Sequence, residues 1–284
     1  MPTDFLWYLD MFNRYGWMVG VLLLERLFPI RRETPLVSRG WVYDLIHMHE
    51  PFLRALIVGG AVAILLPLMQ KHVPGAGLLV NQSLWISIIA MVVVNEAATY
   101  WGHRLLHRLP WLWEFHRVHH SSTTYYSLIA TRFHVVDVLI ALGPALVLAN
   151  WLGIRPDVQI GYSLFLGFMD RYVHSNVRGP RFTGYIFNTP YFHSWHHSTD
   201  PEAHDKNFSR VFVFMDYLFG TAYYPKDKVA REFGDPQFPV NYFVQQALPF
   251  WSVGKMIARK FAPATPQTPT PSIVEKELSE PRAR

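Results

Sequence analysis

A seven-residue pattern, F-H-x-x-H-H-S, occurs twice in the chain, first from Phe115 and again from Phe192. The residues around the two copies do not match, so the pattern indicates a shared local chemistry and not a structural repeat. A further pair, His103 and His107, precedes the first copy. Residues three or four apart on a helix lie on one face, so each group can present several imidazoles to one ion. Within each copy, we expect the first histidine to share a face with the second, and the third to be rotated by about 100° from the second.

These eight histidines predict a dinuclear metal site. Imidazole is a ligand for iron, zinc, copper and nickel, whereas a structural zinc site closes with four ligands. The sequence has no cysteine, so any metal must be held by nitrogen and oxygen atoms. The zinc-protease motif His-Glu-x-x-His is absent, because Arg104 follows His103. Serine-hydrolase, P-loop and dinucleotide-binding motifs are also absent, which leaves metal chemistry as the main prediction.

Several other polar residues in this stretch are candidates to bind the metal or to orient its ligands. Glu96 lies in an apolar segment, where an acid is expected to be functional. It is expected to be a ligand, an acceptor that fixes a histidine tautomer, or an acid paired with an arginine. Asp170 and His174 are four residues apart, and the alternative for Asp170 is an ion pair with Arg171 or Arg178. Further candidates for orienting the ligands are His134, Asp137, His204 and Asn207.

The elements that must position these side chains are apolar helices. Hydrophobic residues make up 50% of the 284 residues and charged residues 17%, against about 25% charged in a typical soluble domain. Residues 52–70 and 83–101 are each long enough to cross a bilayer, which takes about 20 apolar residues. Residues 138–152 and 158–173 are shorter and are predicted to form a tilted, kinked or re-entrant hairpin. Residues 15–30 are expected either to span the membrane or to lie at its surface.

The positions of the basic residues predict which side of the membrane carries the histidines. Three arginines lie within residues 31–39 and four within residues 104–132, whereas the loop after residue 70 holds only Lys71. Short loops rich in arginine and lysine stay in the cytoplasm. A hairpin at 138–173 then returns the rest of the chain to that same side, so both copies of the pattern share one compartment. The basic residues form no stripe with interleaved aromatic residues, so nucleic acid is not an expected partner.

We therefore predict an all-α, multi-pass transmembrane bundle of about four spanning or hairpin helices. A cytoplasmic helical cap carries the histidine-rich dinuclear site. Residues 1–51 form a membrane-associated N-terminal segment, residues 52–261 an integral membrane domain, and residues 262–284, rich in proline and threonine and then charged, a disordered tail. The expected location is the inner membrane of a bacterium or the endoplasmic reticulum of a eukaryote.

From Ile88 to Tyr224 the sequence resembles the fatty acid hydroxylase superfamily, in particular its sterol desaturase branch. The resemblance rests on an ordered set of motifs: the histidines at 103 and 107, HRVHHS at 116–121, HSN at 174–176, H-x-x-H-H at 193–197 and FMDYLFGT at 214–221. It implies a membrane di-iron enzyme. The family's metal ligands then fall on His103, His107, His116, His119, His120, His174, His193, His196 and His197.

The resemblance implies O₂-dependent oxidation of an unactivated C–H bond in a sterol, a fatty acyl chain or a related lipid, by hydroxylation or desaturation. Two iron ions are the implied cofactors. A separate electron donor of the cytochrome b5 or ferredoxin type is implied as well, since no fused cytochrome b5 signature is present. The alternative is a membrane transporter or binding protein for zinc or iron. Its ligands would lie at mid-bilayer, whereas these histidines follow the ends of the apolar segments.

Two departures from the family pattern concern the flanks of the histidines. RFHVVD at 132–137 lacks the proline of R-x-H-P-x-E, and Asp137 takes the place of the glutamate. DKNFS at 205–209 stands where many relatives have DKNYG. Neither change removes an expected ligand. Both put the lipid substrate in question, because these loops are placed to shape its binding site.

Overall fold

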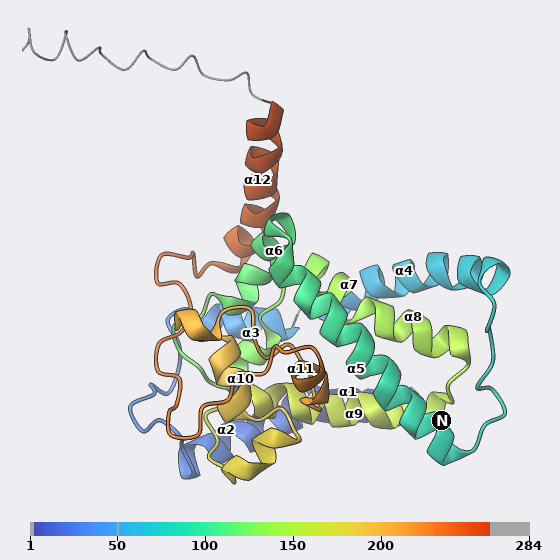
Figure 1. The fold of residues 1–284 in the computed structure, drawn as a ribbon, viewed down its shortest axis with the longest axis horizontal. Helices are drawn as coiled ribbons and strands as arrows, with labels where there is room; N and C mark the ends of the chain where they lie inside the picture. The colour runs from blue at the N-terminus through green and yellow to red at the C-terminus, as the bar shows by residue number, and fades with distance from the viewer. Residues whose placement is uncertain (1–2, 50, 262–284) are drawn as a thin grey trace, which may run out of the picture.

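The structure is a computed structural model that describes residues 3–49 and 51–261. Within these residues every named element is a helix, and the only β-type pairings are three isolated bridges. The all-α prediction is therefore confirmed for the described part of the chain (Figure 1). The predicted tail at 262–284 lies outside the described residues.

The described residues begin with a helical segment that changes type twice without a break. It consists of α1 (Thr3–Met11), the π-helix η1 (Phe12–Gly16) and α2 (Trp17–Leu27). The predicted candidate at 15–30 is thus the second half of a longer segment that ends at Leu27. The short helix α3 (Trp41–His49) follows in the cap.

Two of the described helices are long and apolar enough to cross a membrane. They are α4 (Pro51–His72), in which the apolar stretch is Ala55–His72, and α5 (Leu84–Arg108). A third candidate is the pair α7 (Val135–Ala141) and α8 (Gly143–Leu152), whose axes differ by 41° at the break. The segment predicted at 138–152 is therefore two helices that begin earlier and bend. The described helices thus include two candidate spans, or three if the bent pair counts as one, against the predicted four or so.

The predicted hairpin turn is present between α8 and α9 (Pro156–Val173). Gly153 ends α8 with φ +76°, a left-handed conformation that favours glycine. Pro156 then occupies the first turn of α9, where its missing N–H leaves no hydrogen bond unmade. Helix α9 is not among the candidate spans by length and composition. It packs against α2, α5 and α10.

Helix α5 connects the apolar part of the molecule to the histidine-rich cap. Ser83 caps its start by accepting a hydrogen bond from the backbone N–H of Ile86, and the helix then runs for 25 residues to Arg108. It packs against α6, α7, α8 and α9. The approach of α7 is close, since a Cβ at Gly102 would lie 2.4 Å from the carbonyl oxygen of Ile140. The same helix thereby carries Glu96 in its apolar part and His103 and His107 at its end.

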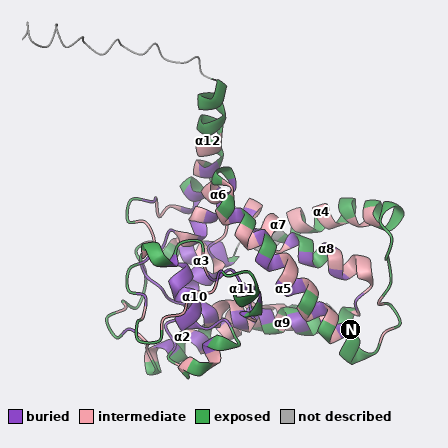
Figure 2. Ribbon diagram, in the orientation of Figure 1, coloured by how far each residue is buried: buried purple, intermediate pink, exposed green. Residues whose placement is uncertain are grey.

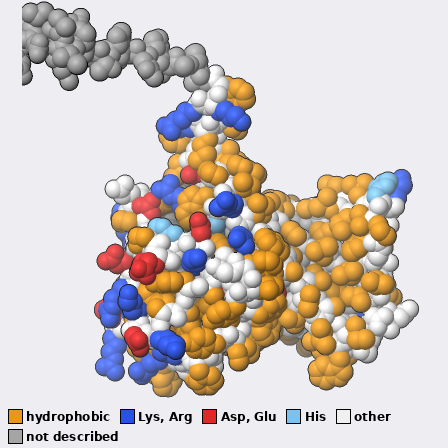
Figure 3. All heavy atoms as spheres, in the orientation of Figure 1, with side chains coloured by type: hydrophobic (Ala, Val, Ile, Leu, Met, Phe, Trp, Pro, Cys, Tyr) orange, Lys and Arg blue, Asp and Glu red, His pale blue; other side chains and the backbone are white. Residues whose placement is uncertain are grey.

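The remaining elements form the cap. They are α6 (Pro110–His120), η2 (Ser127–Thr131), η3 (Arg181–Tyr185), α10 (Pro190–His196), η4 (Pro201–Ala203), α11 (Phe214–Leu218) and α12 (Tyr242–Phe261). Buried residues concentrate around α10, α3 and α2, whereas the described side chains of α4 are exposed or half-buried (Figure 2). Lysine, arginine and acidic side chains gather on the cap, and the surface over α4, α5 and α8 is mostly hydrophobic (Figure 3). The molecule thus has a charged end and an apolar end.

Candidate metal centre

All nine predicted metal ligands converge in the cap, in two neighbouring groups. The nitrogen atoms within each group lie within 4.8 Å of one another. The first group holds His103, His107, His116, His120 and His196. The second group holds His119, His174, His193 and His197.

Each F-H-x-x-H-H-S copy divides its three histidines between the two groups. His116 and His120 belong to the first group and His119 to the second. In the other copy, His196 belongs to the first group and His193 to the second, with His197 beside it. The first and third histidines of each copy are therefore partners, and the expected pairing of first with second is wrong. The reason is the helix period. Side chains four residues apart point in directions that differ by about 40°, whereas side chains three residues apart differ by about 60°.

The proton positions in the centre follow from its hydrogen bonds. Four histidines bond a backbone carbonyl oxygen through Nδ1: His103 to Phe208 (2.9 Å), His119 to Arg132 (3.2 Å), His174 to Asp170 (2.6 Å) and His196 to Lys206 (2.7 Å). A carbonyl oxygen only accepts, so Nδ1 is the donor and carries the proton. In the neutral ring, Nε2 then presents a lone pair. His116 Nδ1 bonds the Asp137 carboxylate at 2.9 Å, which holds its proton in the same way.

These tautomers place lone pairs against each other. His103 Nε2 lies 3.0 Å from His116 Nε2, and His174 Nε2 lies 3.1 Å from His119 Nε2. With both Nδ1 atoms protonated, neither nitrogen of such a pair has a hydrogen to donate, and the two lone pairs repel. A shared cation would remove this repulsion, because both Nε2 lone pairs would then be donated to the ion. The arrangement therefore fits a bound metal ion in each group.

Burial keeps the imidazoles of the cap in the neutral form that binds metal. The pKa values of His116, His119, His193 and His197 are held well below the usual range, first by desolvation and then by neighbouring imidazoles. Burial also lowers the pKa of His174 to about 4, although Asp170 partly opposes this shift. A protonated histidine cannot bind a metal. The centre is thus a cluster of preformed neutral donors.

Of the acids predicted near the ligands, Asp137 contacts one directly and Glu96 does not. Asp137 is fully buried and accepts the His116 bond described above. Glu96 is also buried, but its Oε2 accepts hydrogen bonds from the backbone N–H groups of Val211 (3.2 Å) and Phe212 (3.0 Å). Glu96 therefore positions the backbone of residues 211–212, and none of its hydrogen bonds involves an imidazole.

Asp170 contributes to the centre through its backbone, since its carbonyl oxygen accepts from His174. Its carboxylate binds Arg210, with Nη2 to Oδ2 at 2.6 Å and Nε to Oδ1 at 3.0 Å. The alternative partners Arg171 and Arg178 are therefore replaced by a residue 40 positions later. Arg171 instead donates to the carbonyl oxygens of residues 167 and 14.

The remaining predicted residues lie near the centre without joining either histidine group. Asn207 has φ +59° and bonds the backbone of Phe192 and Tyr223, so it fixes the loop whose carbonyls orient His103 and His196. His134 caps α7 by accepting from the Val136 N–H, and its Nε2 bonds the Gln246 carbonyl. His204 is exposed and lines a cavity beside the centre.

The residues that orient the histidines indirectly were not predicted from the sequence. Asp44, buried in α3, accepts hydrogen bonds from Arg132 Nε (2.7 Å) and Nη2, from Tyr126 (2.6 Å) and from Ser38 (2.8 Å). This network fixes Arg132, whose carbonyl orients His119. The motif at 132–137 indicated that Arg132 lies in a functional segment, but nothing in the local pattern indicates that its partner lies 88 positions earlier.

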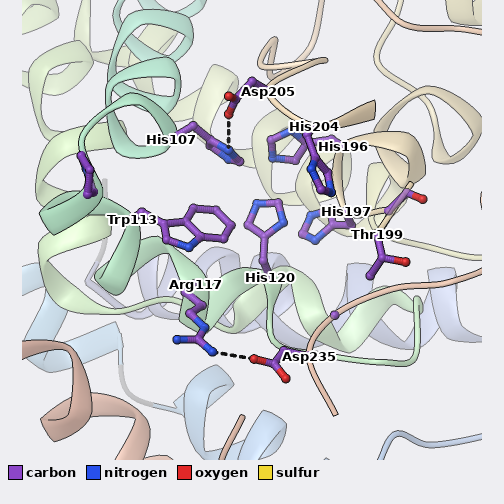
Figure 4. Close-up of a pocket in the computed structure, with 13 residues that line it drawn as sticks. His107, Trp113, Arg117, His120, His196, His197, Thr199, His204, Asp205 and Asp235 are labelled. Carbon is purple, nitrogen blue, oxygen red and sulfur yellow. Dashed lines mark hydrogen bonds and ion pairs between the residues drawn. The ribbon is translucent and has the colours of Figure 1, made fainter. Parts of the chain in front are cut away.

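Two cavities reach the histidines from different sides. The larger, of about 580 Å³, is lined by rings of both groups, including His107, His120, His196 and His197. Figure 4 shows these rings pointing toward one another, with the Asp205–His107 contact and the Arg117–Asp235 ion pair nearby. The smaller cavity, of about 70 Å³, is lined by residues of α5, α7 and α9 and by histidines of both groups. The centre therefore has a polar side in the cap and a side toward the apolar helices.

The histidine groups thus lie between a polar cavity and apolar helices, two of which are long enough to cross a membrane. Residues 88–221 match the family model described as fatty acid hydroxylase. Residues 88–221 therefore carry a fatty acid hydroxylase domain, as their motifs predicted, and this domain supports an oxidoreductase enzyme.

Several curated proteins resemble the chain. An ornithine lipid hydroxylase, OlsE, of Rhizobium tropici is 26% identical over 83% of this chain and 73% of its own length. An alkylglycerol monooxygenase of Danio rerio is 33% identical over 52% of this chain and 32% of its length. A methylsterol monooxygenase of Arabidopsis thaliana is 30% identical over 52% of this chain, which spans 57% of that relative. No solved structure matches the chain.

Proposed function

We propose that the chain is an O₂-dependent oxygenase of membrane lipids that works with two iron ions, one in each histidine group. The observation that supports this most directly is the pairing of Nε2 lone pairs about 3.0 Å apart in both groups. When bound, two iron ions would supply O₂ activation and the oxidation of an unactivated C–H bond. The residues proposed to hold them are His103, His107, His116, His119, His120, His174, His193, His196 and His197.

The chain's own residues prepare the centre for this chemistry. The carbonyl oxygens of residues 132, 170, 206 and 208 hold protons on Nδ1, so that Nε2 of each partner ring is free to bind. Asp137 does the same for His116 and adds a negative charge beside otherwise neutral ligands. Nearby partners of this kind fix ring orientation and raise the basicity of the ligand nitrogen.

We propose that the lipid reaches the centre from the side of α5, α7 and α9. The smaller cavity there includes Ala141, Leu142 and Val173 as well as histidines of both groups. We propose that the larger cavity faces the cytoplasm, where a separate cytochrome b5-type or ferredoxin-type donor supplies electrons. The names of the relatives, which hydroxylate or oxygenate an ornithine lipid, an alkylglycerol and a methylsterol, support a lipid substrate. Hydroxylation and desaturation both remain within the proposal.

The Arg210–Asp170 pair is a candidate contact for the polar part of the lipid. Arg210 carries the only arginine or lysine charge among the described residues that line the smaller cavity. Arg210→Met keeps an unbranched apolar stem and removes the charged guanidinium. We expect kcat/KM for lipid oxidation to fall about 10- to 100-fold, the range for losing a hydrogen bond to a charged group, with iron content unchanged.

A double variant separates this role from a structural one. Arg210→Met leaves the Asp170 carboxylate without its partner, whereas Arg210→Met with Asp170→Asn removes both charges. If the single variant is impaired because it no longer recognises the lipid, the double variant should be equally impaired. Restored activity in the double variant, or loss of iron in the single variant, would show that the pair only supports the fold.

The central test is metal analysis of detergent-purified protein together with O₂ consumption. We expect about two iron ions per chain and O₂ uptake that requires both a reductant and a lipid. Mass spectrometry of the lipid should show an added oxygen or the loss of two hydrogens. Tightly bound zinc alone, with no O₂ uptake across a range of lipids, would contradict the proposal and favour a metal transporter or metal-binding protein.

A further inference from the structure

Helix α12 carries an apolar stripe that stays largely exposed, although one of its members, Phe250, also contacts the rings of Phe115 and His134. Phe243, Phe250, Ile257 and Phe261 recur at intervals of seven, seven and four residues, which places them on one helix face. All four are exposed, from 55% for Ile257 to 79% for Phe261. The residues that attach the helix to the protein, Tyr242, Gln245 and Pro249, are buried and lie on another face.

The charges of α12 are distributed in a way that fits a lipid surface. Lys255, Arg259 and Lys260 lie in its last two turns, and residues 242–261 include no acid. At 100° per residue Lys255 and Arg259 fall on the side of the helix away from the Phe243–Phe261 stripe, whereas Lys260 lies at the edge of the stripe. Lys255 Nζ lies 3.3 Å from the centre of the Trp251 ring. A helix with aromatic and aliphatic residues on one face and basic residues on the other is typical of a helix in the membrane–water interface.

The position of α12 in the fold agrees with this. It packs on α6, which begins at Pro110, two residues after the candidate span α5 ends at Arg108. It therefore leaves the body at the level where the apolar helices give way to the charged cap. In Figure 1, α12 projects crosswise to α4, so it would lie along the plane of a bilayer that α4 crosses. Figure 3 shows basic and hydrophobic side chains together on this helix.

We propose that α12 is an interfacial anchor whose Phe243–Phe261 stripe is buried at the surface of a bilayer containing anionic lipids. The stripe supplies apolar contact, and the three basic residues bind lipid headgroups. This contact adds to the candidate spans and does not depend on the chemistry of the metal centre. It also bears on the centre, because Gln246 of α12 bonds His134, and Phe250 contacts the rings of Phe115 and His134.

The chain has no cysteine, so a single introduced cysteine can be labelled without background. We would label Ile257→Cys on the stripe and, as a matched control two residues away, Arg259→Cys with the same fluorophore. A third variant, Asp227→Cys in an exposed loop of the cap, serves as the aqueous reference. Each full-length variant is reconstituted in vesicles of phosphatidylcholine and phosphatidylglycerol. Quenching by lipids brominated in the acyl chain is then compared with quenching by aqueous iodide.

We expect the probe at Ile257 to be quenched by brominated lipid and shielded from iodide, with the reverse at Asp227 and an intermediate result at Arg259. Replacing phosphatidylglycerol by phosphatidylcholine should reduce the lipid quenching at Ile257. Equal iodide quenching at Ile257 and Asp227 overturns the proposal, because the stripe would then be in water. A probe at Ile257 shielded from both quenchers also overturns it, and disulfide dimers of that variant would then identify a second copy as the occupant.

Discussion

Replacing His197 by alanine should lower the metal content from about two ions per chain to about one and abolish lipid oxidation. The second histidine group has only four members, and loss of one leaves three, fewer than the four that close a tetrahedral site. His197 lies 4.6 Å from His119 between ring centres, in the middle of this group. We expect activity to fall by more than about 100-fold, the upper value for losing only a partner that orients a ligand. Elemental analysis and O₂ uptake measure the two effects.

The first group provides an internal comparison, because it has five members. His120→Ala leaves four nitrogens, so this variant should retain more metal than His197→Ala does. His204→Ala is the matched control: His204 lines the same cavity but belongs to neither group, and both ions should remain bound. Equal metal content in the His197→Ala and His204→Ala variants would show that the second group is not a metal site.

Local sequence patterns predicted the helices and the identity of the clustered histidines. The length of a single apolar segment was enough to predict α4 and to predict α5. Ser83, Gly153 and Pro156 mark helix ends by their own backbone preferences. The histidines follow the ends of these helices, which brought them to one place. The division of the histidines into two groups was harder to predict. Residues four apart on a helix are about 40° from the same direction and residues three apart about 60°, a difference of only about 20°. The grouping also depends on how α6 and α10 are packed.

The atoms that orient the ligands could not be predicted in the same way. Four of them are backbone carbonyls, which every residue has and no side-chain pattern distinguishes. The ionic partners are distant in sequence: Arg210 binds Asp170 across 40 positions, and Arg132 binds Asp44 across 88. Glu96 likewise bonds the backbone of residues 211–212, a segment more than 100 positions later in the chain. Tertiary packing decided which of several local possibilities was realised.

Breaking the Arg132–Asp44 pair on one side should cost more stability than breaking any other ion pair of the described residues. Both side chains are almost fully buried, at 3% and 0% exposed, so solvent does not screen them. Arg132→Met removes the cation and leaves the Asp44 carboxylate uncompensated in the interior. We expect the free energy of unfolding to fall by about 3–5 kcal/mol. Iron should be lost from the second group as well, because the Arg132 carbonyl orients His119. Thermal melting and elemental analysis of the purified variant test both expectations.

Two further variants decide whether the buried charge is the cause. Arg155→Met breaks an exposed pair with Asp157, in which water already solvates both groups, and should leave the melting temperature unchanged. Arg132→Met with Asp44→Asn removes the stranded carboxylate, so it should recover part of the stability that the single variant loses. If the double variant melts no higher than the single one, the loss comes from packing around Arg132. If Arg132→Met alone melts like the parent, the network does not hold α3 to the metal centre, and His119 must be oriented by the 127–131 turn itself.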